Sequence, residues 1–207
     1  MAPHLDRFLK SFTLSALLFA VWGWLGFRHA LSLGEHFDPV ELLWVIYNVT
    51  LALLFLLRSR PSIVSLNGWH WLVALLTSFS GFFFDRRPIA QLAAQRAAAD
   101  VIMAMGLLVG VVAAVSLRRS YDFIPALRRT QTGGAYRVVR HPMYMSSMAI
   151  RLGYLVRHPS ALNLGVFAIM IYLYILRAAF EETIMNRDPV YQTYRERVRW
   201  KFIPGLH

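Results

Sequence analysis

The run from Ala97 to Leu117 carries one charged side chain, that of Asp100, and this feature limits the possible folds most strongly. About 20 mainly apolar residues in a helix are enough to cross the hydrocarbon core of a bilayer. The rest of the chain has the same bias, since 57% of its 207 residues are hydrophobic and 16% are charged. Soluble domains carry about 25% charged residues. The sequence therefore predicts an all-α fold, a polytopic transmembrane helical bundle.

Six apolar segments are expected to cross or enter the membrane, separated by charged or helix-breaking residues. They are residues 11–33, 40–57, 66–84, 97–117, 143–156 and 161–180. The fifth segment is short and contains Arg151, so it is expected either to tilt or to stop inside the bilayer. Gly106 and Gly110 in the fourth segment would allow a neighbouring helix to approach closely.

Arginines account for most of the net charge of +11, and they gather in the segments between the apolar runs. The strongest cluster between two runs lies at 118–140, and cytoplasmic loops carry an excess of Lys and Arg. This pattern favours a membrane orientation over nucleic-acid binding. With Arg7 and Lys10 at one end and an arginine-rich tail at the other, both termini are predicted to be cytoplasmic. Segment 1–10 lacks a clear cleavage site after the next apolar run, so that run is expected to be retained.

The densest group of reactive and polar side chains follows the fourth apolar run, in the segment Gly133–Tyr144. Glycine N–H groups and arginines can bind a carboxylate or phosphate, and tyrosine faces can hold a cation. A simple helix start at the lipid headgroups is the alternative interpretation. The candidate binding residues are Tyr136, Arg137, Arg140, His141, Pro142, Met143 and Tyr144.

A pair of carboxylates, Glu181 and Glu182, ends the sixth apolar run. Arg177 lies one helical turn before Glu181 and can pair with it, which would leave Glu182 for a ligand. The alternative is a solvated helix end. Arg151 is also a functional candidate, because charged residues inside membranes are costly and usually functional. Snorkelling to the outer interface is its alternative. We expect the two segments to meet in one site, with Glu182, Arg177 and Arg151 as catalytic candidates.

Other kinds of site receive no support from the sequence. The chain contains no cysteine, which excludes disulfides and thiolate chemistry. Its histidines do not form the dense clusters that a membrane di-iron centre needs, so no metal site is predicted. Neither a dinucleotide-binding glycine motif nor a Walker loop is present.

The ordered motifs of the last 75 or so residues resemble the isoprenylcysteine carboxyl methyltransferase and phospholipid methyltransferase superfamily of integral-membrane enzymes. They are Gly-Ala-Tyr-Arg-Val-Val-Arg-His-Pro-Met-Tyr, an apolar hairpin, Glu-Glu, then Tyr-x-x-Tyr-x-x-Arg-Val and Phe-Ile-Pro-Gly. The resemblance implies a single integral-membrane domain over 1–207. Residues 1–118 would form four transmembrane helices, and residues 119–207 a catalytic loop, a helical hairpin and a cytoplasmic, cofactor-binding cap.

The resemblance also implies a function. S-adenosylmethionine would be the methyl donor, leaving as S-adenosylhomocysteine, and the residues of the loop and the glutamate pair would line its pocket. Tyr194 and Arg197 would belong to the cap. A lipophilic or amphiphilic acceptor would enter from the bilayer, either an isoprenylcysteine carboxylate or a phospholipid amine, or a smaller thiol or alcohol.

Two other functions compete with this one. The first is a non-catalytic membrane protein whose arginines bind anionic lipid. The second is a membrane reductase of sterols or similar lipids that uses a nicotinamide cofactor. The sequence leaves open the acceptor, the atom methylated and the oligomeric state.

Overall fold

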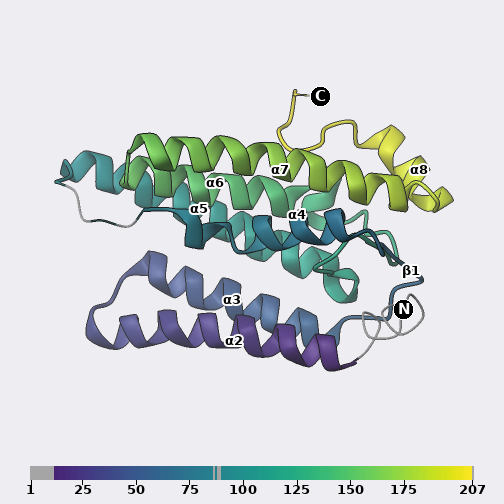
Figure 1. Cartoon of the computed structure of the whole chain (residues 1–207), viewed down its shortest axis with the longest axis horizontal. Helices are drawn as coiled ribbons and strands as arrows, with labels where there is room; N and C mark the ends of the chain where they lie inside the picture. The colour runs from purple at the N-terminus through teal and green to yellow at the C-terminus, as the bar shows by residue number, and fades with distance from the viewer. Residues whose placement is uncertain (1–11, 86, 88–89, 207) are drawn as a thin grey trace.

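The computed structural model describes residues 12–85, 87 and 90–206. Arg7 and Lys10, which contribute to the predicted orientation, lie outside this range, as does the segment 1–10 as a whole. The protein is 73% helical with almost no strand, so the predicted all-α class is confirmed. Its helices lie roughly along one common direction (Figure 1).

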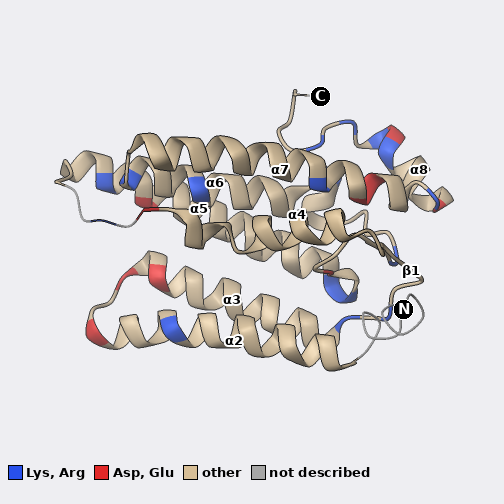
Figure 2. Cartoon of the chain, viewed as in Figure 1, with Lys and Arg blue, Asp and Glu red and all other residues tan. Residues whose placement is uncertain are grey.

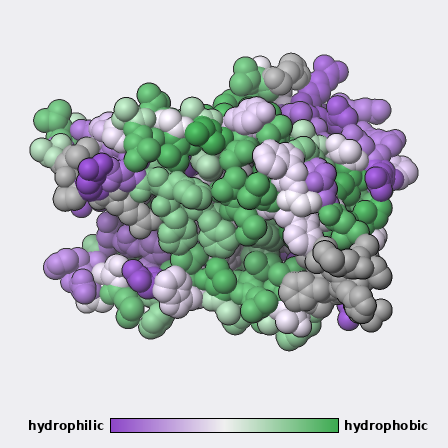
Figure 3. Space-filling model, viewed as in Figure 1, coloured by the Kyte–Doolittle hydropathy of each residue, from purple (hydrophilic) through white to green (hydrophobic). Residues whose placement is uncertain are grey.

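Four helices are long and apolar enough to cross a membrane. They are α2 (Phe12–Glu35), α3 (Pro39–Leu57), α5 (Ala93–Leu117) and α7 (Ala161–Met185). They correspond to the first, second, fourth and sixth predicted segments. Hydrophobic residues cover the middle of the visible face, and hydrophilic residues gather toward its two ends (Figure 3). The chain is a multi-pass membrane protein.

The prediction of one long helix over 66–84 is wrong. The segment forms α4 (Gly68–Ser78) and then a separate 3₁₀ turn, η1 (Ser80–Phe83). The hydroxyl of Thr77 donates to the carbonyls of Val73 and Ala74, and that of Ser80 donates to the carbonyl of Thr77. Hydroxyls bonded to nearby carbonyls compete with the helical hydrogen-bond pattern. The segment therefore ends its α-helix inside the bundle.

The fifth segment forms α6 (Pro142–Arg157), which has 16 residues and is short, as predicted. It packs closely on α5 because small residues face each other. A Cβ added at Gly106 would lie 3.0 Å from the backbone nitrogen of Ile150, and one at Gly110 would lie 2.5 Å from the hydroxyl of Ser146. The hydroxyl of Ser146 donates to the Gly106 carbonyl at 2.7 Å. The predicted close approach at both glycines is confirmed.

The connections at one end of the bundle are tied together. A two-stranded antiparallel ladder pairs β1 (Ile63–Val64) with β2 (Ala126–Leu127). Beside it, Asp122 forms ion pairs of 2.7 Å with both Arg58 and Arg128. The loops after α3 and α5 therefore lie on the same side of the bundle. Short 3₁₀ turns, η2 (Arg118–Ser120) and η3 (Gly134–Arg137), complete the second loop.

The C-terminal helix α8 (Pro189–Arg197) closes the same end. It begins where Asp188 accepts a hydrogen bond from the backbone nitrogen of Val190. Its inner face packs with η3 in a small cluster of Tyr136, Tyr191, Tyr194 and Val198. Basic residues gather around α8, whereas acidic residues mark the opposite end of the α2–α3 hairpin (Figure 2).

Candidate functional site

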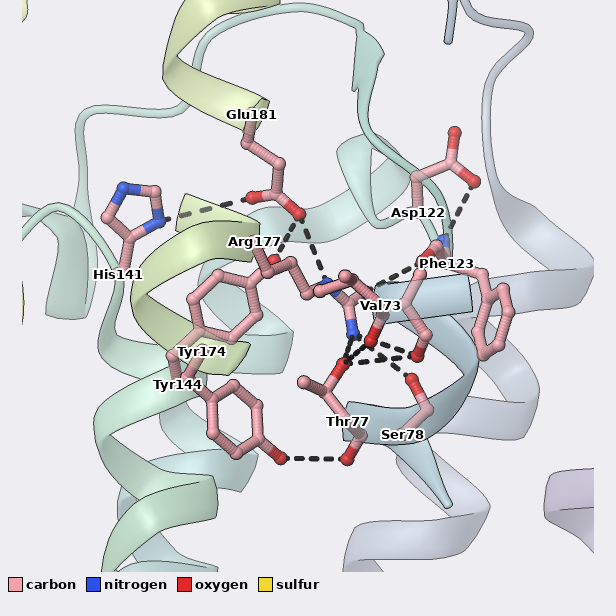
Figure 4. Close-up of polar contacts among 11 residues, drawn as sticks. Val73, Thr77, Ser78, Asp122, Phe123, His141, Tyr144, Tyr174, Arg177 and Glu181 are labelled. Atoms are coloured by element: carbon pink, nitrogen blue, oxygen red, sulfur yellow. Dashed lines mark hydrogen bonds and ion pairs between the residues drawn. The ribbon is translucent and has the colours of Figure 1, made fainter. Parts of the chain in front are cut away.

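The start of α6 and the end of α7 meet at the α8 end of the bundle. His141 Nε2 lies 3.0 Å from Glu182 Oε1, and the Tyr144 hydroxyl donates to Glu181. Figure 4 shows Glu181 between His141, Tyr144 and Arg177. The histidine and tyrosine rings stack almost in parallel, with centroids 5.4 Å apart. The two segments singled out by the sequence are therefore neighbours in space.

Glu182 is buried, with 5% of its surface exposed, and lies among an arginine, a lysine and a histidine. Its carboxylate is 3.0 Å from His141, 3.1 Å from Arg140 Nε and 3.4 Å from Lys201. The backbone nitrogens of Arg140 and His141 each donate to carbonyls of the C-terminal segment, those of Trp200 and Lys201, at 2.9 Å. Glu182 therefore joins α7 to the start of α6 and to the tail.

Glu181 has a different environment, although it is the adjacent residue. Its side chain is 21% exposed and lines a cavity. Besides the Tyr144 hydroxyl, it has Arg177 Nε at 3.5 Å and His141 Nδ1 at 3.9 Å. Glu181, rather than Glu182, is the carboxylate that a ligand in the cavity can reach.

Arg177 is held by backbone and hydroxyl groups from two other elements. It donates to the Thr77 hydroxyl at 2.8 Å and the Ser78 hydroxyl at 3.1 Å on α4. It also donates to the carbonyl of Phe123 in the loop after α5, at 2.7 Å (Figure 4). Its guanidinium lies 5.2 Å from the centre of the Tyr144 ring. Arg177 fixes the positions of Glu181 and Tyr144 and has few donors left for a ligand.

The cavity has a volume of about 1170 Å³ and extends from this cluster through the bundle. Ligand pockets usually measure about 300–1,000 Å³, so this one is large enough for a cofactor and part of a lipid. At the α8 end its walls include Arg140, His141, Tyr144, Glu181, Tyr191 and Tyr194. Farther in, they include Trp22, Trp44 and Tyr47 of α2 and α3, and Arg151 of α6.

The tyrosines at the α8 end keep their protons. Burial raises the pKa of Tyr136, Tyr191 and Tyr194 well above its usual value. The Tyr194 hydroxyl donates to the Tyr136 carbonyl at 2.8 Å. The Tyr191 hydroxyl is buried and has no hydrogen-bond partner among the described residues. Arg140 Nε is also without an aligned hydrogen bond there, despite its nearness to Glu182. The α8 end of the cavity thus has free hydrogen-bonding capacity.

A model of the phospholipid methyltransferase family matches residues 94–193, from the start of α5 into α8. This region is similar to the phospholipid methyltransferase family. The matched residues include the start of α6, the hairpin and both glutamates. The match supports a membrane methyltransferase that acts on lipid-like substrates. No curated protein matches the chain.

Within this family region, the predicted site residues separate into two groups. Those that line the cavity are Tyr136, Arg140, His141, Met143, Tyr144, Arg151, Arg177 and Glu181. A second, smaller cavity lies beside Arg140, Gln192 and Lys201. Arg137 is exposed and lines neither of these two cavities. Pro142 is buried as the first residue of α6, and Glu182 also lies outside the cavity wall. The assignment of roles to all these residues stays a prediction.

Three further features of the site either lie beyond the matched residues or were not predicted from the sequence. Tyr194 lines the cavity, but Arg197 is exposed and lies away from it. The Tyr191 hydroxyl, which has no hydrogen-bond partner among the described residues, had no sequence signal. Lys201 reaches Glu182 from a segment that carries no local motif for this contact.

The glycine pair before α6 serves mainly to bring the loop against α5. Gly134 has φ +59°, as glycine permits, and a Cβ there would lie 2.1 Å from the Ser116 hydroxyl. The Ala135 nitrogen donates to that hydroxyl at 3.3 Å, and the Tyr136 nitrogen donates to the Gly133 carbonyl. These N–H groups therefore have partners within the protein.

Among the described residues, no three His, Asp or Glu side chains are grouped as metal ligands would be.

Proposed function

We propose that the chain is an integral-membrane methyltransferase that uses S-adenosylmethionine to methylate an amphiphilic acceptor. The observation that carries the proposal is the position of Glu181. It lies beside Tyr144 and His141 on the wall of a deep cavity, within the region that matches the family. A methyl donor and a lipid-like acceptor could meet at this point.

The groups at the α8 end suit the donor. Arg140 and the free hydroxyl of Tyr191 would bind its carboxylate and other polar groups, and the faces of Tyr144 and His141 would lie beside its cation. When bound, S-adenosylmethionine supplies a methyl group that is already activated. The protein then contributes mainly position and exclusion of water.

Glu181 would act on the acceptor. An alcohol or protonated amine must lose a proton to become a nucleophile, and a carboxylate within hydrogen-bond reach can accept it. Tyr144 and Arg177 hold this carboxylate in place, since one donates to it and the other pairs with it. A carboxylate acceptor would need no base, and Glu181 would then serve only to orient the donor.

The active end is proposed to face the cytoplasm. The loops after α3 and α5, together with the tail, carry most of the arginines at this end, which agrees with the positive-inside pattern. The donor would enter from the cytosol, and the acceptor from the bilayer.

The test is methyl transfer by the purified protein in lipid nanodiscs. The protein is incubated with methyl-labelled S-adenosylmethionine and extracted membrane lipids, and the labelled product is identified by mass spectrometry. Glu181→Gln should lower the rate at least tenfold, whereas Glu35→Gln should not, because Glu35 is exposed at the far end of α2 and lines neither cavity.

Thermal stability separates the competing functions. S-adenosylhomocysteine should raise the melting temperature of the protein, and NADPH should not. Stabilisation by NADPH alone would favour the reductase instead. The absence of both stabilisation and labelled product would reject the methyltransferase.

A further inference from the structure

Helix α6 presents a polar stripe to the cavity along its whole length. Its members are spaced three or four residues apart, which places them on one face of the helix. They are Tyr144, Ser147, Arg151, Tyr154 and His158, and all of them line the cavity. The stripe begins at the tyrosine that holds Glu181 and continues toward the opposite end of the bundle.

Arg151 is the charged member of this stripe. Its Nε donates to the Ser80 hydroxyl at 2.8 Å, and one terminal nitrogen lies 3.4 Å from the Ser147 carbonyl. Within the described part of the chain, no carboxylate lies within 4 Å of it. Two other arginines of the hairpin do have one, since Arg157 pairs with Asp100 and Arg177 pairs with Glu181.

Snorkelling does not account for this side chain. Arg151 is partly buried, and its hydrogen bond to Ser80 directs it into the bundle toward η1. A charged arginine within a membrane helix is energetically costly. The two contacts use two of the five N–H donors of a guanidinium. An anion in the cavity would use the remaining donors and offset the cost.

The position of Arg151 defines the length of such a ligand. Arg151 follows Tyr144 by seven residues, so two helical turns, roughly 10 Å, separate them along the helix axis. The lining of the same cavity also includes the apolar side chains of Trp22, Trp44 and Leu51, which suit a hydrocarbon chain.

We propose that the middle of the cavity binds the anionic group of a chain-bearing amphiphile, and that Arg151 makes the enzyme selective for anionic over neutral acceptors. A phosphate or carboxylate would accept two parallel hydrogen bonds from the guanidinium. The acceptor atom would lie roughly 10 Å from this group, at Glu181. The proposal rests on the proposed function for the use of the ligand, but binding itself requires no methyl donor.

The experiment measures binding without donor, by quenching of tryptophan fluorescence. Two probes share a dibrominated stearoyl chain: a lysophosphatidic acid and the corresponding monoacylglycerol. Bromine bound in the cavity would quench Trp22 and Trp44. The wild-type protein in maltoside detergent should bind the lysophosphatidic acid at least tenfold more tightly than the monoacylglycerol.

Three variants locate the selectivity. Arg151→Gln should weaken binding of the lysophosphatidic acid at least tenfold and leave that of the monoacylglycerol unchanged, which also shows that the cavity is intact. Arg151→Lys should keep most of the preference because it keeps the charge. Arg187→Gln removes one exposed arginine outside both cavities and should change neither affinity.

Equal affinities of the wild type and Arg151→Gln for the lysophosphatidic acid would overturn the proposal, as would equal binding of both probes by the wild type. Displacement of the probe by millimolar inorganic phosphate would assign the site to a soluble anion and reject the amphiphile. Selective binding without methyl transfer would leave this site standing and count against the proposed function alone.

Discussion

Replacing Glu182 with glutamine should release the C-terminal segment from the start of α6. The carboxylate of Glu182 is the shared partner of Arg140, His141 and Lys201. Glutamine has nearly the same shape and can keep one hydrogen bond, but it removes the negative charge. Arg140 is buried and would then lose its counter-charge.

The structure sets the size of the effect. Breaking a buried ion pair by removing one partner typically costs 3–5 kcal/mol. The lower end applies here, because the Lys201 side chain is 34% exposed and can remain solvated. A local loss of about 3 kcal/mol corresponds to roughly a 100-fold increase in opening, at about 1.4 kcal/mol for each factor of ten.

Hydrogen exchange at two amides reports this opening directly. The nitrogens of Arg140 and His141 donate to carbonyls of the tail, so their exchange should accelerate roughly 100-fold in Glu182→Gln. Glu181→Gln is the matched control, since Glu181 contacts Tyr144, Arg177 and the His141 ring, and among the described residues no hydrogen bond or ion pair joins it to the tail. It should slow methyl transfer without changing exchange at these amides. Unchanged exchange in Glu182→Gln, or equal acceleration in both variants, would refute this account of the pair.

Three further changes test the surroundings of the site. Arg177→Ala should lower the free energy of unfolding by about 3 kcal/mol or more, and with it the melting temperature, the yield of monodisperse protein and the activity. The exposed Arg187→Ala should lower none of these. An effect on activity alone would place Arg177 in contact with the ligand. Tyr191→Phe should leave the melting temperature unchanged, because its hydroxyl has no partner among the described residues, and should weaken S-adenosylhomocysteine binding about tenfold by calorimetry; unchanged affinity would remove this hydroxyl from the donor site. Gly110→Ala should destabilise the protein by about 1–3 kcal/mol through overpacking against α6, in contrast to Gly165→Ala, which meets nothing within 4 Å; equal melting temperatures would contradict the packing.

The sequence predicted the long membrane helices well, because hydropathy adds up along a segment whatever its neighbours are. The start of α8 also has a local signal, because Asp188 followed by Pro189 is a typical cap and first turn of a helix. It did not indicate the break between α4 and η1. Side-chain hydroxyls produce this break through local bonds, and Thr77 and Ser80 add too little polarity to change the hydropathy of the segment.

The sequence also brought together the two parts of the candidate site and paired Arg177 with Glu181, but it did not show which of the two glutamates lines the cavity. Adjacent residues on a helix point about 100° apart, so the rotation of α7 decides which one reaches the cavity. Arg177 settles that rotation by its bonds to α4 and to the loop after α5. These partners are about 100 and 54 residues away in the chain, and no local pattern reports them.

The early end of α4 and the position of α7 have a common cause. The carbonyl of Thr77 belongs to the last turn of α4, where carbonyls have no partner within the helix. Here that carbonyl accepts bonds from the hydroxyls of Ser80 and of Tyr174 on α7, at 2.8 and 2.9 Å. The side-chain hydroxyl of the same residue, Thr77, accepts a hydrogen bond from Arg177. A helix that crossed the whole bilayer would use its carbonyls internally, whereas the helix that stops here offers one to α7 and thereby helps to hold Arg177 beneath Glu181.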